Sequence, residues 1–350
     1  MTHLDFGRRM HRLGLPGRPL MLVDARSVRV CTGLWIVTAA LAVFAVFSGS
    51  AQISFPEAIA ALLGRGDDYT TMVVLEWRAP RILMAILLGI CLAMSGAIFQ
   101  NLTGNPLGSP DVIGFQTGSY TGALIVMLIL GGGSAATMGG ALTGGVATAF
   151  IVFFLSSRRG EVRGVRLIIV GIGVSAMLSS VNVWILLSAT VEDAIMAGLW
   201  GAGNLSGVSW SAVAVTAAGS MAFLVGALAL SRPMRLMQLG VPFATALGQN
   251  VRIVQVSAIV VGVGLTALAT ATVGPISFIA LAAPQIARRI VRSDGLALAP
   301  TAAVGALLLL LADVVAQRIH PDSPLPVGIV TVSIGGLYFL WLLLREGKRR

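Results

Sequence analysis

The residues able to carry out chemistry are few in this sequence. Lys348 is the only lysine and no Gly-Lys-Ser/Thr motif occurs, so the chain lacks the loop that binds nucleotide phosphates. Gly262-Val-Gly-Leu-Thr-Ala267 is spaced like a dinucleotide-binding fingerprint, but it lies inside an apolar stretch, where glycines serve helix packing. The three histidines are scattered and form no metal-ligand pattern. We therefore predict no catalytic, cofactor-binding or metal-binding residues, and a chain that is not an enzyme.

Asp313 is the one acidic residue that falls within a stretch expected to cross a membrane. Carboxylates at such positions mark proton or ion relays in ion-coupled carriers. A structural hydrogen bond is the alternative that we favour for Asp313, because a single carboxylate is little for a relay. A transporter without a coupling ion must take its energy from a partner protein.

The composition places these residues in a membrane protein. The 350 residues are 56% hydrophobic and only 11% charged, with 42 glycines, whereas soluble domains carry about 25% charged residues. The net charge of +10 does not indicate nucleic-acid binding, because the arginines occur in short clusters between apolar stretches. Cys31 and Cys91 lie inside apolar stretches, so we expect two free thiols and no disulfide.

Ten stretches are candidates for membrane-spanning helices, each of which needs about 20 apolar residues. Two of them share Val112–Ser157, where Gly131-Gly-Gly-Ser134 marks the hairpin. We expect Ala51–Arg78 to be an outer loop with a short helix, and a second short outer helix to end near Trp200. The remaining eight stretches are Val30–Ser48, Pro80–Gln100, Leu167–Leu187, Ser209–Leu230, Ile253–Val273, the short Ile276–Ile290, Leu298–Val315 and Val327–Leu344.

The basic residues set the expected orientation. With ten spans, every Lys and Arg falls on the side of the two termini except Arg65, Arg78, Arg81 and Arg318. Basic residues accumulate in cytoplasmic loops, so we place both termini in the cytoplasm. We divide the all-α polytopic chain into a basic cytoplasmic arm (1–27), which is not a cleavable signal, one membrane domain (28–345) and a cytoplasmic tail (346–350).

The segment 231–252 is too polar to span a bilayer and too apolar for a solvated connector. Apolar residues alternate with small and polar ones, and Gly240, Pro242 and Gly248 interrupt them, which suggests two short helices lying flat against a surface. The segment either anchors on the membrane surface or docks into a groove of another protein. We favour docking, with membrane anchoring as the alternative.

The loop from Asn105 to Asp111 also has an unusual composition. Two prolines and a glycine, in Pro106-Leu107-Gly-Ser109-Pro, prevent it from continuing a helix, yet it holds no basic residue. Irregular backbone at membrane depth is tolerated where it is buried in protein or lines a cavity, so we place the loop at the inner mouth of a pathway. Asp111 either caps the following helix, which we favour, or contacts substrate. A rigid turn without a gating role is the alternative for the whole loop.

Five blocks of the sequence occur in a fixed order: Arg78-Ala-Pro-Arg81 with Gly89 and Ser95–Gln100, Asn105–Gly114, Leu239-Gly240 with Ala246–Gly248, Gly274–Arg288, and Leu325–Thr331 with Gly335-Gly336. Together they resemble the FecCD-type permeases of ABC importers for iron siderophores and cobalamin. The match extends from about residue 30 to the end of the chain. Three features depart from the family pattern: Gln285 stands where histidine is common, Leu337-Tyr338 replaces a proline-containing turn, and the basic N-terminal arm is longer than usual.

The resemblance implies a type II ABC importer permease in the bacterial inner membrane that works by alternating access. Its implied partners are a sister permease in a heterodimer, two copies of an ATPase that bind ATP and magnesium, and an extracytoplasmic binding protein. Ser109–Phe115 and Ala197–Trp200 are closest to the enterobactin branch of the family, which implies a ferric siderophore as substrate. An ion-coupled secondary transporter, or a cobalamin or haem permease of the same family, is the alternative.

The resemblance also implies roles for three groups of residues. The groups are ATPase coupling through Gln238, Leu239, Gly240, Ala244, Leu247 and Gly248; a cytoplasmic gate at Asn105, Pro106, Leu107, Ser109 and Asp111; and docking of the binding protein through Arg65, Arg78, Arg81 and Arg318.

Overall fold

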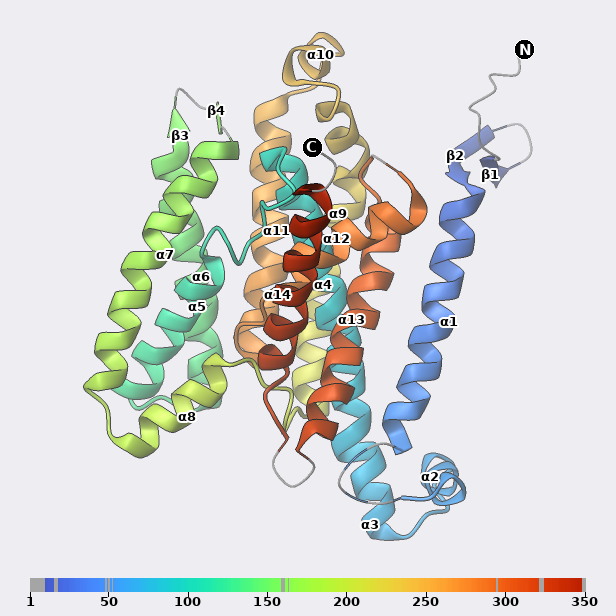
Figure 1. Cartoon of the computed structure of the whole chain (residues 1–350), viewed down its shortest axis with the longest axis vertical. Coiled ribbons are helices and arrows are strands. Elements are labelled where there is room, and N and C mark those ends of the chain that lie inside the picture. The colour runs from blue at the N-terminus through green and yellow to red at the C-terminus, as the bar shows by residue number, and fades with distance from the viewer. Residues whose placement is uncertain are drawn as a thin grey trace.

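The computed structural model describes residues 10–15, 18–47, 49, 51, 53–158, 161–162, 164–293, 295–320 and 324–347. Within these ranges the chain is a helical bundle with two short β-hairpins (Figure 1). The elements are β1 (Met10–Leu15), β2 (Arg18–Asp24), α1 (Ala25–Phe47), α2 (Phe55–Leu62), α3 (Asp68–Thr71), η1 (Met72–Arg78), α4 (Ala79–Thr103), α5 (Phe115–Leu124), η2 (Ile125–Ile129), α6 (Ser134–Ser156), β3 (Ser157–Arg158), β4 (Glu161–Val162), α7 (Gly164–Leu187), α8 (Val191–Gly201), α9 (Trp210–Met237), α10 (Val241–Ala246), α11 (Val251–Val273), α12 (Ile279–Val291), α13 (Leu298–Ile319) and α14 (Val327–Gly347).

Seven helices in the described ranges are long and apolar enough to cross a membrane. They are α1, the continuous stretch Asp68–Thr103, α6, α7, α9, α11 and α13. The other three predicted spans correspond to α5 with η2, to α12 and to α14; the described apolar helices there are shorter, as in Phe115–Ile129. Gly131–Ser134 separates η2 from α6, as the sequence predicted. Seven spans thus follow from length and composition, and ten remains a prediction.

The centre of the bundle is α4, which packs against α9, α11, α12 and α13 (Figure 1). Glycine allows two of these contacts. A Cβ atom added at Gly89 would lie 2.4 Å from the carbonyl oxygen of Gly305 in α13. At Gly96 an added Cβ would overlap the backbone of Ala280 in α12. Small residues at these crossings let the backbones approach closely, as is usual where helices pack in lipid.

The second span begins earlier than predicted. The helix that contains α4 extends back through η1 and α3 to Asp68, so the part of the predicted outer loop from Asp68 to Arg78 is helical. Val73 and Val74 are buried on this extension and pack with Ala58 and Ala61 of α2. That apolar contact stabilises the extra helical turns. The predicted span did not include them, because it was placed only by its run of about 20 apolar residues.

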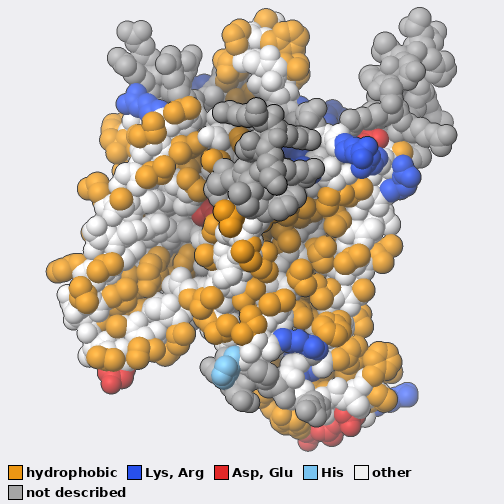
Figure 2. Space-filling view, in the orientation of Figure 1, with side chains coloured by type: hydrophobic (Ala, Val, Ile, Leu, Met, Phe, Trp, Pro, Cys, Tyr) orange, Lys and Arg blue, Asp and Glu red, His pale blue; other side chains and the backbone are white. Residues whose placement is uncertain are grey.

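The two ends of the bundle differ in charge (Figure 2). One end carries the hairpins and α10, while α2, α3 and α8 lie at the other (Figure 1). Acidic residues of the far end include Glu57, Asp67 and Asp68 in and beside α2 and α3. Arginines at the α10 end include Arg26, Arg29, Arg166, Arg232, Arg235, Arg252, Arg288, Arg289 and Arg292.

Candidate functional site

The prominent feature of the α10 end is a projecting tip (Figure 1). The chain enters and leaves α10 at Gly240 and Gly248, whose φ values of +108° and +80° strain any residue with a side chain. α9 continues to Met237, so the tip has one short helix where the sequence suggested two. The turns at Gly240 and Gly248 place α10 across the ends of α9 and α11.

The tip exposes four large apolar side chains, those of Leu239, Val241, Phe243 and Leu247, which we call the apolar tip. Leu239 is 64% exposed and Leu247 is 58% exposed, and apolar side chains cover this projection in Figure 2. Gln238 is also exposed, whereas Ala244 is fully buried inside the chain. Ala244 therefore holds the tip in place and does not belong to its outer surface.

Hydrogen bonds fix the tip to the bundle. Gln249 donates from Nε2 to the carbonyl oxygen of Pro233 at 3.0 Å, and Asn250 caps α11 by accepting from the N–H of Ile253 at 3.2 Å. Arg235 donates to the carbonyl oxygen of Leu296 at 3.4 Å, which links α9 to the connection between α12 and α13. A force on the tip is thus transmitted to α9, α11 and that connection.

The loop after α4 folds back on itself. The side-chain oxygen of Asn105 accepts from the N–H of Leu107 at 2.9 Å, and the N–H of Gly108 donates to the carbonyl of Asn105 at 2.9 Å. This local turn engages Asn105 and leaves Leu107 41% exposed. Ser109 is fully buried, and its hydroxyl has no hydrogen-bond partner among the residues that the structure describes.

Asp111 bonds to a different helix from the one expected. The position before α5 is Gly114, which provides no side-chain cap, and the carboxylate of Asp111 instead accepts from the backbone N–H of Phe278 at 3.1 Å. Phe278 precedes α12 and has a φ of +71°. The prediction that Asp111 caps the following helix was therefore wrong, because the loop turns it towards the start of α12.

A polar cavity of about 320 Å³ adjoins this contact. Asp111, Gln116, Asn182 and Ser277 are among the residues that line it. One oxygen of Asp111 and the side-chain oxygen of the buried Asn182 have no hydrogen-bond partner in the described chain. The cavity therefore contains two oxygen atoms that could accept hydrogen bonds from a ligand. The alternative that Asp111 contacts the substrate stays a prediction.

Three long polar side chains join the end of α4 to α12. The side-chain oxygen of Gln100 accepts from Gln285 at 2.7 Å and also from Arg288, while its amide donates to the carbonyl of Leu281 at 3.0 Å. The amide of Gln285 also lies 3.5 Å from the carbonyl oxygen of Pro106. The sequence marked Gln285 only as a departure from histidine and did not indicate its partners.

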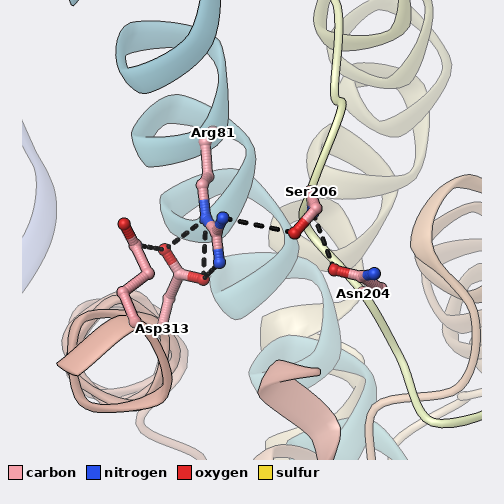
Figure 3. A network of polar contacts seen from close by, with 5 residues as sticks. Arg81, Asn204, Ser206 and Asp313 are labelled. Atoms are coloured by element: carbon pink, nitrogen blue, oxygen red, sulfur yellow. Dashed lines mark hydrogen bonds and ion pairs between the residues drawn. The ribbon is translucent and has the colours of Figure 1, made fainter. Parts of the chain in front are cut away.

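At the opposite end, Arg81 of α4 and Asp313 of α13 form a buried ion pair (Figure 3). The guanidinium approaches Asp313 Oδ1 to 2.7 Å, and its Nε lies 3.0 Å from each carboxylate oxygen. Gln317 donates to the same carboxylate at 2.8 Å, and Arg81 reaches Ser206 at 3.4 Å. The side chain of Asp313 is only 1% exposed, so its charge is neutralised and satisfied within the protein, as a structural role requires.

The four arginines predicted to dock a binding protein are in different environments. Arg78 is buried and donates to the carbonyl oxygens of Val46 and Ala51, both at 2.6 Å. Arg81 pairs with Asp313, so the guanidinium groups of Arg78 and Arg81 both bond to partners within the chain. Arg65 is exposed, and Arg318 is exposed with its guanidinium 4.8 Å from the ring centre of Phe44.

Acidic caps fix the helices beside Arg65. The N–H of Ser54 donates to Glu57 at 2.8 Å, and this backbone hydrogen bond, with that of the Ser54 hydroxyl, lowers the pKa of Glu57. Hydrogen bonds from the hydroxyl and then the N–H of Thr70 lower the pKa of Asp67. Both carboxylates therefore stay ionised near neutral pH, and each satisfies free N–H groups at the start of a helix.

A sequence profile described as the FecCD transport family matches residues 37–345. The chain belongs to the FecCD transport family. This FecCD chain is 44% identical over 331 residues to FepG, the ferric enterobactin transport system permease protein of Escherichia coli K12, across 95% of this chain and all of FepG. It is 35% identical to FecD, the Fe(3+) dicitrate transport system permease protein of the same organism, across 78% of this chain and 85% of FecD.

A solved structure shares the fold of the FecCD chain. It comes from an ABC transporter assigned to the metal-chelate type, in an inward-facing conformation. It has a TM-score of 0.77 and 25% sequence identity, and the match covers 91% of this chain and 99% of the other. The chain thus has the fold of a permease from this transporter class.

Proposed function

We propose that this chain is a permease subunit of an ATP-driven importer that carries ferric siderophores. The observation that supports it most is the 44% identity to FepG, which extends over the whole of FepG. The iron(3+)-hydroxamate permease FhuG of Bacillus subtilis, 31% identical, is another relative whose name specifies a ferric chelate. The chain itself then ligates no iron, because the chelator supplies the ligands.

In the proposed topology ten helices cross the bacterial inner membrane, and the α10 end faces the cytoplasm with both termini. The arginines at that end support this orientation. Cysteines at Arg166 and Asp67, both exposed, then react with impermeant reagents from opposite sides. Cys31 and Cys91 are replaced first, and same-side labelling refutes the topology. The basic arm before Met10 and the tail after Gly347 lie outside the described residues.

In the assembled importer we place the apolar tip in a groove of the ATPase. Four exposed apolar side chains on a braced projection favour a protein partner over solvent. The ATPase binds ATP and magnesium, and this chain supplies neither a nucleotide site nor a cofactor site. A sister permease completes the pathway in a heterodimer, and two ATPase copies drive it.

We assign the loop from Asn105 to Asp111 to the cytoplasmic gate. Its turn, its exposed Leu107 and its bonds to α12 support this role. Alternating access then follows if ATP binding favours one arrangement of the permeases, which takes a differential free energy of several kcal/mol. At the outer face, Arg65 and Arg318 are the docking candidates that remain.

An ion-coupled carrier is the other candidate class. Among the described residues, Asp313 is the only fully buried carboxylate, and it is paired with Arg81. Uptake measured with the ion gradients collapsed and ATP intact separates the two classes. Continued uptake supports the ATP-driven importer, whereas loss of uptake with gradient collapse supports a carrier.

The substrate class is tested by uptake in a strain that lacks this permease. We expect labelled ferric catecholate to enter after the gene is restored. Ferric hydroxamate, haem and cobalamin serve as comparisons, and haem is included because the hemin permease HmuU of Yersinia pestis is 34% identical. Uptake of haem or cobalamin without any ferric siderophore overturns the proposed substrate.

A further inference from the structure

A groove runs along the surface between α6, α9 and α11. Its volume is about 400 Å³. Its walls include Val146, Phe150 and Phe153 of α6, Phe223 of α9, and Val256 and Val260 of α11, and the described lining holds no polar side chain. Gly264 forms part of the same wall, because a Cβ atom there would lie 2.4 Å from the ring of Phe223.

The groove occupies one half of the membrane thickness. An α-helix rises about 1.5 Å per residue, so the lining of α11 from Val256 to Gly264 spans about 12 Å. It begins about 6 Å from Arg252 and ends about 18 Å from it. The hydrocarbon core is about 30 Å thick, or about 15 Å per leaflet. The groove thus lies within the leaflet at the α10 end and ends near the middle of the bilayer.

A cation marks the mouth of this groove. Arg252, Val256 and Val260 are four residues apart and therefore lie on one face of α11. Arg252 is exposed and makes no hydrogen bond or ion pair with any residue that the structure describes. It lies in the first turn of a 23-residue helix, where the helix dipole adds positive potential. An apolar groove of leaflet depth therefore begins at a cation that has no partner in the described part of the chain.

We propose that this groove binds an anionic phospholipid of the cytoplasmic leaflet, with one acyl chain along α11 and the phosphate paired with Arg252. Charge complementarity and depth select this occupant. A volume of 400 Å³ along a length of about 12 Å gives the groove a cross-section of about 33 Å². A helix at least about 10 Å across does not fit this cross-section. The groove is therefore wide enough for an acyl chain and too narrow for a helix of a partner protein. The site relies on the proposed orientation in the membrane and is independent of the substrate.

The test is native mass spectrometry of the assembled, delipidated importer titrated with phosphatidylglycerol or phosphatidylcholine. Arg252→Gln removes the cation, and Val260→Trp fills the groove from a position that is 56% exposed. We expect Arg252→Gln to weaken phosphatidylglycerol binding about fivefold, as for one cation at the membrane surface, and Val260→Trp to weaken the binding of both lipids because it occupies the space of the acyl chain. Arg252→Gln weakens phosphatidylcholine binding less than phosphatidylglycerol binding, because the choline cation already balances the phosphate of phosphatidylcholine.

Two matched variants are the controls. Arg29→Gln removes another exposed arginine of the same end, and Val225→Trp enlarges a valine that is 57% exposed outside the groove. Both keep the phosphatidylglycerol affinity of the parent. Equal affinity for the two lipids in the parent, or equal losses in test and control variants, overturns the proposal. The readout does not involve uptake, so failure of the substrate assignment leaves this result intact.

Discussion

The carboxylate of Asp111 accepts a hydrogen bond from the backbone N–H of Phe278 across 167 residues of sequence. It joins the loop after α4 to the start of α12. In the middle of α12, Gln285 lies 3.5 Å from the carbonyl oxygen of Pro106 in the same loop and also donates to Gln100 of α4. The loop thus contacts both the start and the middle of one helix, which suits a gate that moves with α12.

Replacing Asp111 tests this connection. Asp111→Ala leaves the N–H of Phe278 without its acceptor, at a cost of about 1–3 kcal/mol, and we expect more ATP hydrolysed per siderophore transported in proteoliposomes. Asp111→Asn keeps an acceptor oxygen and serves as the control with near-normal coupling. Tight coupling in Asp111→Ala would remove the connection from the mechanism.

The exposed side chain of the gate loop is tested by Leu107→Ala. If Leu107 excludes water from the pathway, the variant leaks a small solute from proteoliposomes, while assembly with the ATPase survives. Asn105→Ala removes the acceptor of the local turn and is expected to have the same effect. Absence of leak and normal coupling in both variants would show that the loop is only a turn.

The buried ion pair is tested by a double-mutant cycle on thermal stability in detergent. The single changes are Arg81→Met, which leaves the carboxylate of Asp313 buried without its cation, and Asp313→Leu, which leaves the guanidinium without its anion. We expect the loss for Arg81→Met to be about 3–5 kcal/mol. The double change Arg81→Met with Asp313→Leu should cost much less, because no charge remains unpaired. Arg65→Gln, at an exposed site, is the control. Additive losses in the cycle would contradict a direct interaction.

The apolar tip is tested by Leu247→Asp. If the ATPase buries the side chain at position 247, the aspartate loses the apolar contribution of the leucine and places a charge in the contact. We therefore expect the affinity for the ATPase to fall about tenfold or more. Co-purification at several salt concentrations measures it. Leu63→Asp, at an exposed leucine of the far end, leaves assembly unchanged. An assembled, transport-competent Leu247→Asp importer would exclude the tip as the docking element.

Docking of the binding protein is tested by reversing charge at the far end. Arg65→Glu and Arg318→Glu are expected to weaken docking about fivefold at low salt, and the difference shrinks as the Debye length falls below about 10 Å. Arg78→Glu should instead lower the yield of folded protein, because Arg78 bonds two buried carbonyls. Affinities that do not depend on salt would argue against electrostatic docking.

The helices could be predicted from the sequence better than the contacts between them. Hydrophobic length and the glycine run at 131–133 predicted which stretches are helical, because these signals are local, whereas the bounds differ: the second span begins at Asp68 and α9 continues to Met237. The partner of Asp111 was not predictable, since Phe278 is brought to it by packing and donates from its backbone. The same holds for Arg78: its type indicated a surface role, and the carbonyls that bury it come from α1 and the following loop.

The contact of Gly89 with Gly305 has a consequence for how the chain changes shape. Backbone meets backbone there, so no side chain is present whose rotamer could absorb a change in spacing. The same is true where Gly96 meets Ala280. Helices α4, α12 and α13 must then travel as one rigid body through the transport cycle. Hinges then belong to the loops that leave this body, and α5 with α6, which meet backbone to backbone at Gly122 and Gly140, forms a second unit of the same kind.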